Sequence, residues 1–103
     1  MITLRLDEYE VFSNTAIVLE NDVGMLILST NLCHLPHGLV ALDSVDYPWA
    51  LDFLLSNGYV TYDNSAVLSE SVRYPVVKPT FKDPIDITDL PATEKIKQYF
   101  WEV

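Results

Sequence analysis

Apolar residues occupy every second position over residues 2–7, and polar residues occupy the positions between them. A period of two is typical of a strand with one buried face, so we predict a half-buried strand here. Two apolar runs, residues 15–20 and 25–30, flank an Asn-Asp-Val-Gly sequence, which predicts a β-hairpin. Because apolar residues fall on both faces of each run, we expect these two strands to be covered on both sides.

A short apolar run at residues 39–42 is followed by residues 47–57, which are predicted to form a helix. The carboxylate of Asp46 can accept hydrogen bonds from the free N–H groups of the first turn, where Pro48 is tolerated because no backbone donor is needed. Gly58 can end the helix because glycine enters the left-handed region without strain. Apolar side chains cover most of this helix, so we expect it to pack on more than one side, in the core or in a dimer interface.

Further strands are predicted at residues 58–63 and 66–69, separated by an Asp-Asn-Ser turn, and at residues 70–77. Pro75 lies within the last of these runs and lacks a backbone N–H, which favours a position at the edge of a sheet. Four prolines between residues 75 and 91 exclude a helix there. We therefore expect an extended segment along the surface.

Two short elements complete the predicted fold. Residues 85–88 alternate and predict a short strand, and residues 89–103 predict a terminal helix. The narrow apolar face of that helix consists of Ala92, Ile96, Tyr99 and Phe100. Together the elements predict an α+β fold with a mostly antiparallel sheet of about five strands and two helices packed on it. The length predicts a single domain over residues 1–103.

The composition excludes several classes of protein. Of the 103 residues, 50% are hydrophobic, which is too apolar a composition for a disordered chain. No apolar stretch reaches the roughly 18 residues that a membrane-spanning helix needs, and the first residues lack the basic and apolar blocks of a secretory signal. A single cysteine excludes an internal disulfide framework. We therefore expect a cytoplasmic protein that makes no membrane contact, in its own cell or in the cytoplasm of an infected host.

The charge is strongly acidic and unevenly distributed. Fifteen acidic residues face six basic ones, which gives a formal net charge of −9, and no Lys or Arg occurs between Arg5 and Arg73. Direct binding to a nucleic acid needs basic side chains that displace counterions, so it is not expected for this part of the chain. A basic protein partner is electrostatically favoured, although an acidic surface can also serve solubility alone.

These observations predict a small acidic, non-enzymatic binding protein that inhibits or regulates a basic, nucleic-acid-binding protein. Its concrete form would be an anti-defence inhibitor of a phage or mobile element, an immunity protein, or an antitoxin. The candidate partner-binding residues are the exposed carboxylates with two aromatic anchors, namely Glu8, Glu10, Glu20, Asp22, Asp43, Asp46, Asp52, Asp63, Tyr47 and Trp101. Trp49 and Phe53 are expected in the core. The alternative is an assembly subunit or homodimer that self-associates through its apolar helix faces.

The sequence Asn-Leu-Cys-His-Leu-Pro-His-Gly holds the only cysteine, Cys33, and both histidines, His34 and His37. Three ligands with no second cluster elsewhere make a weak metal site, so we interpret the segment as a structural turn. We expect Cys33 or His34 to point inward and His37 to lie near solvent. A small enzyme that uses these three residues is the remaining alternative.

Other chemical sites are not evident in the sequence. It contains no phosphate-binding glycine loop, no nucleophile-elbow motif and no Lys or Arg cluster for an anionic ligand. We therefore expect no catalytic residue, metal or cofactor.

Overall fold

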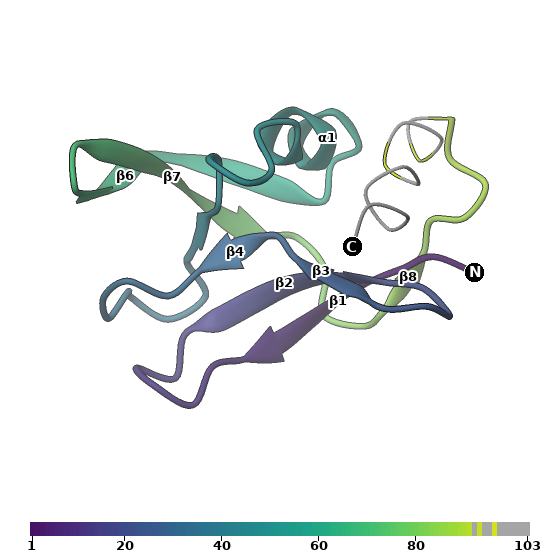
Figure 1. Cartoon of the computed structure of the whole chain (residues 1–103), viewed down its shortest axis with the longest axis horizontal. Helices are drawn as coiled ribbons and strands as arrows, with labels where there is room; N and C mark the ends of the chain where they lie inside the picture. The colour runs from purple at the N-terminus through teal and green to yellow at the C-terminus, as the bar shows by residue number, and fades with distance from the viewer. Residues whose placement is uncertain (92, 94–95, 97–103) are drawn as a thin grey trace.

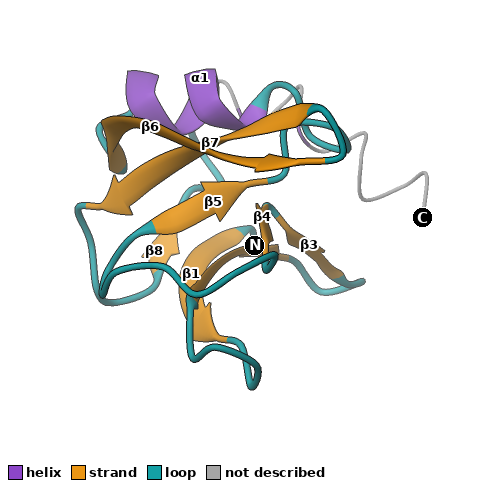
Figure 2. Cartoon of the chain, turned by 90° about the vertical axis from the view of Figure 1, so that its left-hand side faces the viewer, coloured by secondary structure: helices purple, strands orange, loops and turns teal. Residues whose placement is uncertain are grey.

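Two four-stranded antiparallel sheets and one helix form the described part of the chain, which comprises residues 1–91, 93 and 96 of the computed structural model. The first sheet has the order β3-β2-β1-β8, with β1 at Thr3–Glu8, β2 at Thr15–Glu20, β3 at Met25–Ile27 and β8 at Ile85–Asp86. The second has the order β4-β5-β7-β6, with β4 at Ser29–Thr30, β5 at Val40–Leu42, β7 at Val72–Pro79 and β6 at Val60–Ser69. The helix α1, Ala50–Ser56, lies at one end of the molecule, and β1 and β2 lie at the other (Figures 1 and 2).

The prediction of an α+β fold with mostly antiparallel strands is confirmed, but the predicted number of elements is wrong. The described residues form eight strands in two sheets, with one helix. The apolar run at residues 25–30 divides between the two sheets and forms both β3 and β4. The short runs at residues 40–42 and 85–86 also pair as full members of the sheets.

Most of the predicted terminal helix lies outside the described residues. Of the predicted helix, residues 89–91, 93 and 96 are described. Residues 89–91 are not helical, so the predicted start is wrong, and Thr93 and Ile96 are buried.

The two sheets are joined through Leu28, the residue that separates β3 from β4. Its N–H donates to the Ile17 carbonyl of β2, at 2.8 Å, and its carbonyl accepts from the Asp43 N–H that follows β5, also at 2.8 Å. The Leu28 backbone is therefore bonded to the first sheet through one group and to the second sheet through the other. Its side chain is fully buried, so this crossing point also lies in the core.

Ser29 completes the hydrogen bonding where the strand leaves β2. Its buried hydroxyl accepts from the Ile17 N–H at 3.1 Å and also hydrogen-bonds with the Tyr9 hydroxyl at 2.9 Å. Inside a protein, an N–H that has lost its acceptor costs about 1–3 kcal/mol. A side-chain oxygen thus supplies the acceptor that a regular neighbouring strand would have given to Ile17.

The hydrophobic core lies between the inward faces of the two sheets and extends to α1. Its buried members from the sheets and the helix include Leu4, Ile17, Leu19, Leu26, Leu28, Val40, Leu42, Phe53, Leu54, Val60 and Val77. β2 is covered on both faces, as predicted, since Ala16, Ile17, Val18 and Leu19 are all buried. The same prediction is wrong for β3, an edge strand whose Met25 and Ile27 are exposed.

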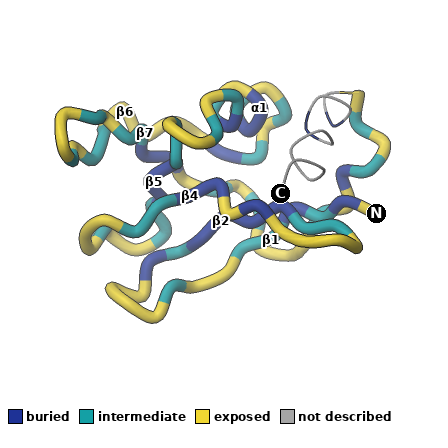
Figure 3. Tube along the Cα trace, in the orientation of Figure 1, coloured by how far each residue is buried: buried dark blue, intermediate teal, exposed yellow. Residues whose placement is uncertain are grey.

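The long hairpin of β6 and β7 differs from the prediction in two ways. The Asp-Asn-Ser sequence is not a turn but part of a register shift between Tyr62 and Ser65, so residues 60–69 form one strand. β7 lies inside its sheet and not at an edge, because β5 pairs with it at Val76 and Val77. Pro75 is compatible with this position because the pairing between β5 and β7 ends at Val76 and does not include it. Beyond β5 the hairpin extends to an exposed tip (Figure 3).

The helix α1 is shorter than predicted and lacks the expected cap. It begins at Ala50, with Trp49 at the N-cap position, and no side chain caps the helix, so the predicted capping by Asp46 is wrong. Gly58 follows the helix with a φ of 73°, which confirms the predicted stop. No helix in the described ranges has both the length and the apolar character that crossing a membrane requires.

The two ends of the described chain meet at the edge of the first sheet. β8 pairs with Thr3 and Leu4 of β1, and the Ile87 N–H donates to the Ile2 carbonyl at 2.9 Å. The Ile2 N–H in turn donates to the Thr88 hydroxyl at 2.8 Å. The first sheet is therefore completed by residues that are more than 80 positions apart in the sequence.

The role of Ser29 can be tested by urea denaturation. Ser29→Ala should lower the free energy of unfolding by about 1–3 kcal/mol, because the Ile17 N–H loses its acceptor in a buried position. Tyr9→Phe removes only the second contact of the Ser29 hydroxyl and should cost about 0.5–1.5 kcal/mol. Equal losses in the two variants would show that the Ile17 contact is not the main source of the effect.

Candidate functional site

The predicted partner-binding carboxylates lie at several separate places. Glu8 ends β1 and Glu10 follows in the β1–β2 connection, whereas Asp22 lies in the β2–β3 turn at the opposite end of β2. A six-residue strand spans roughly 20 Å. Asp63 lies in the register shift of β6, and Asp52 is exposed on α1. These five residues therefore do not form one continuous surface.

One group of predicted residues does come together: Asp43, Asp46 and Tyr47 lie in the connection between β5 and α1. Glu20 instead pairs with Arg5, which was not among the predicted residues. Trp101 lies outside the described residues.

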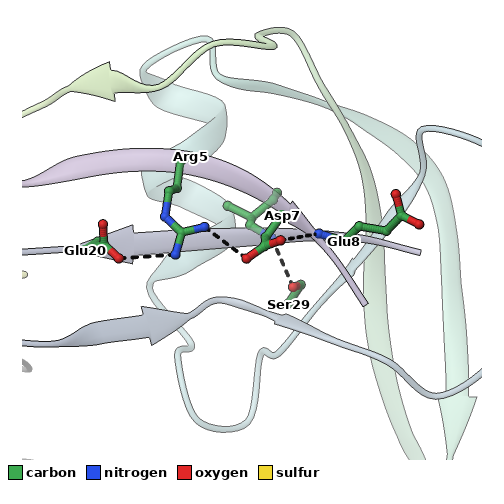
Figure 4. A network of polar contacts seen from close by, with 6 residues as sticks. Arg5, Asp7, Glu8, Glu20 and Ser29 are labelled. Atoms are coloured by element: carbon green, nitrogen blue, oxygen red, sulfur yellow. Dashed lines mark hydrogen bonds and ion pairs between the residues drawn. The ribbon is translucent and has the colours of Figure 1, made fainter. Parts of the chain in front are cut away.

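The network around Arg5 neutralises part of the acidic surface (Figure 4). Its guanidinium contacts Asp7 through Nη1 at 3.1 Å and Glu20 through Nη2 at 3.2 Å. Two hydrogen bonds lower the pKa of Asp7: the larger contribution comes from the Glu8 N–H and the smaller from the Arg5 side chain. Because Glu20 is already paired with Arg5, it is less available to a partner than an unpaired carboxylate.

The acidic segment, which we define as residues 43–52, has a different electrostatic environment. The Asp43 carboxylate accepts a hydrogen bond from the Asp46 N–H at 3.0 Å, and the Asp43 carbonyl accepts one from the Tyr47 N–H. The pKa of Asp46 is raised by its hydrogen-bonding contact with the Asp43 side chain and by the charge of Asp43. This turn explains the missing cap, because Asp46, four residues before the helix begins at Ala50, is held against Asp43.

Aromatic rings connect the acidic segment to the far side of α1. The Tyr47 ring contacts the Trp49 ring edge-on, with 5.9 Å between the ring centres, and Trp49 contacts Phe53 at 6.1 Å. Phe53 contacts Tyr59 at 6.2 Å, and Tyr59 contacts Phe81 at the same distance. Phe53 is buried as predicted, and Trp49 is half-buried against the core. Burial, followed by the charges of the neighbouring carboxylates, raises the pKa of Tyr47. Tyr47 is therefore a fixed, half-buried aromatic side chain beside two carboxylates.

The loop that contains Cys33, His34 and His37 is held by a single buried side chain, Asn14. Its amide donates to the Cys33 carbonyl at 2.7 Å and to the Asn31 side chain at 2.9 Å, and its oxygen accepts from the Leu35 N–H at 3.0 Å. The loop therefore turns its backbone toward the protein. Cys33, His34 and His37, which the enzyme alternative would use, are all exposed.

The prediction that Cys33 or His34 lies inward is therefore wrong, whereas the exposed position of His37 is confirmed. The Asn14 side chain hydrogen-bonds to backbone groups of the loop, at Cys33 and Leu35, so the loop is held without an inward-pointing Cys33 or His34 side chain. In the part of the chain that the structure describes, no group of three or more His, Cys, Asp or Glu residues could hold a metal ion.

Two adjoining depressions lie beside this loop and share Thr15, His37 and Gly38. The first, of about 230 Å³, is polar and includes Glu8 and Asn14. The second, of about 290 Å³, is lined by Leu6, Thr15, His37, Gly38, Lys78, Pro79, Phe81 and Lys82, and we call it the lysine groove.

The sequence analysis missed this lysine groove, since it found no Lys or Arg cluster. The two lysines are four residues apart, and Pro79 and Phe81 lie between them in the sequence. A spacing of four residues places side chains on one face of a helix, but Pro79 and Pro84 exclude a helix here, so no periodic pattern placed the two lysines together. The signal that could have found them is the concentration of bases after residue 72.

Comparisons with known proteins give no relative: no family model matches the chain, and neither curated proteins nor solved structures give a significant match. A functional assignment therefore depends on the residues and geometry of the chain itself.

The contact between Asp43 and Asp46 predicts a measurable titration. By carbon-detected NMR, the pKa of Asp46 should lie above the ordinary value of 3.8. In Asp43→Asn it should return toward 3.8, since the amide oxygen still accepts from the Asp46 N–H but carries no charge. A raised acid pKa favours the folded state at low pH, and this contribution is lost as the pH rises through the folded-state pKa. An unchanged Asp46 titration in Asp43→Asn would contradict the contact.

The role of Asn14 predicts a graded effect on the neighbouring loop. Asn14→Ala removes three hydrogen bonds and should lower the free energy of unfolding by about 1–3 kcal/mol. Amide exchange at Leu35 should become faster in this variant. Asn31→Ala leaves the two contacts between Asn14 and the loop backbone and should therefore have a smaller effect. Unchanged exchange at Leu35 in Asn14→Ala would exclude this role.

Proposed function

We propose that this chain is an acidic, non-enzymatic binding protein that blocks or regulates a basic protein partner. The acidic segment, residues 43–52, is the proposed contact surface. The observation that carries the proposal is the close pair of carboxylates at Asp43 and Asp46, which repel each other and raise the pKa of Asp46. An ammonium or guanidinium group placed between them would relieve this repulsion.

The distribution of cations supports the choice of this surface. Arg5 is paired with Asp7 and Glu20. The other Lys and Arg residues that the structure describes all follow residue 72, namely Arg73, Lys78 and Lys82. Within the described ranges, no Lys or Arg nitrogen comes within 4 Å of a carboxylate of the acidic segment. Its charge is therefore available to a partner, unlike that of Glu20.

Neighbouring side chains give the acidic segment the mixed character of an interface. Val45 is 58% exposed, Pro48 is exposed and Tyr47 is half-buried, so apolar surface adjoins the two carboxylates. Asp52 extends the negative charge onto the exposed side of α1. Tyrosine beside charged groups is typical of residues that contribute strongly to protein–protein binding.

Self-association through the helix is less well supported. The apolar residues of α1 already pack within the chain, because Ala50, Phe53 and Leu54 are buried and Leu51 and Leu55 contact the same core. The face that would be needed for an apolar dimer interface is thus largely occupied. An inhibitor of a nucleic-acid-binding protein, such as an anti-defence protein, an immunity protein or an antitoxin, remains the concrete form of the proposal.

Binding to an arginine-rich peptide tests the proposal. A fluorescent peptide should bind at low ionic strength and be released as salt is added, because the contacts are charge pairs near solvent. The combined variant Asp43→Asn, Asp46→Asn and Asp52→Asn should weaken binding by about tenfold, as expected for three exposed charge pairs.

A charge-matched control separates this surface from general electrostatic attraction. Glu10→Gln, Asp22→Asn and Asp63→Asn remove the same charge from places outside the acidic segment. Their combined variant should bind within about twofold of the original chain at physiological salt, where distant charges are screened. Equal weakening by the two triple variants would refute the acidic segment as the site, and the absence of any salt-sensitive binding would refute the proposed function.

A further inference from the structure

The lysine groove arises where the first sheet loses an edge partner. β8 pairs only with Thr3 and Leu4, so the later part of β1, from Leu6 onward, is left without a neighbour on that side. The chain between β7 and β8 does not follow β1 here. Thr80 instead attaches this segment to the residues that follow α1. Its N–H donates to the Tyr59 carbonyl at 2.9 Å, and its hydroxyl donates to the Gly58 carbonyl at 2.6 Å.

This arrangement places an apolar floor beneath charged side chains. Phe81 follows the anchor at Thr80, is half-buried and contacts Tyr59 at a ring distance of 6.2 Å. Leu6 and Pro79 are also half-buried and line the same groove. The floor is therefore positioned by the core and by backbone hydrogen bonds.

The charge at the lysine groove is opposite to that of the chain as a whole. Four Lys and Arg residues fall within the described ranges, and two of them, Lys78 and Lys82, line this groove together with His37. No described carboxylate lies within 4 Å of either lysine nitrogen. Two cations without an internal counter-ion, in a groove that an aromatic ring also lines, are complementary to an anion with an apolar body.

The size and surroundings limit the ligand further. A volume of about 290 Å³ lies at the lower end of the range for small-molecule pockets, so a single ring with one acidic group fits and a dinucleotide does not. Glu8 lines the adjoining depression, where it would repel a second anionic group. The complementary ligand is therefore a monoanion.

We propose that the lysine groove binds a small aromatic or cyclic monocarboxylate. Its ring lies against Phe81, and its carboxylate meets Lys78 and Lys82. This site lies outside the acidic segment and has the opposite charge, so it is independent of the proposed binding to a basic partner. The Thr15 hydroxyl and His37 are the remaining polar groups at the rim that can contact the ligand.

Titration of the full chain with benzoate, followed by proton–nitrogen correlation NMR, tests this site. Benzoate should produce saturable shifts at the amides of Thr15, Gly38 and Lys82. Benzylamine keeps the ring without the negative charge, and acetate keeps the carboxylate without the ring, so each should bind at least about tenfold more weakly. Equal affinity for benzoate and either of these probes, or no saturable shift with benzoate, would overturn the proposal.

Matched variants localise the binding. Lys78→Gln with Lys82→Gln should weaken benzoate binding by about tenfold, since both charged donors are removed from exposed positions. Arg73→Gln removes an exposed cation from the same strand but outside the groove, and should leave the affinity within about twofold. Unchanged binding in the lysine variant, or an equal loss in Arg73→Gln, would exclude the lysine groove as the site.

Discussion

The fold depends on the hydrogen bonds of one residue, Leu28, which joins the two sheets. Its N–H is bonded to β2 and its carbonyl is bonded to the residue after β5, so the chain leaves one sheet and enters the other without an intervening loop. Ser29 stabilises this change of sheet, because its hydroxyl accepts the hydrogen bond that the Ile17 N–H would otherwise lack. The same crossing anchors Asp43, and through it the acidic segment is attached to the buried residue Leu28.

Charge is arranged locally and not as one anionic face. Arg5 is surrounded by carboxylates at 3.1 and 3.2 Å, whereas Asp43 and Asp46 face each other without a described cation nearby. The free lysines lie at the open edge of β1, where an apolar floor is also exposed. The molecule thus presents two surfaces of opposite charge, which are connected through the aromatic contacts between Tyr47 and Phe81.

Features set by neighbouring residues could be predicted from the sequence, and features set by distant contacts could not. The β2–β3 hairpin and the stop at Gly58 follow from local periodicity and backbone freedom. The position of β7 inside its sheet was missed because Pro75 was considered without knowing how far β5 extends. The lysine groove was missed for a similar reason, since it combines side chains from β1, β2, the His37 loop and the end of β7.

The pairing of β1 with β8 has a consequence for how the protein forms during translation. The second strand of this pair lies at residues 85–86, so β1 leaves the ribosome long before its partner is available. Contacts between such distant parts of a chain are slow to form, because a long loop must first close. Until residues 85–86 have been synthesised, this edge of the first sheet lacks its partner and is open to pairing with other strands.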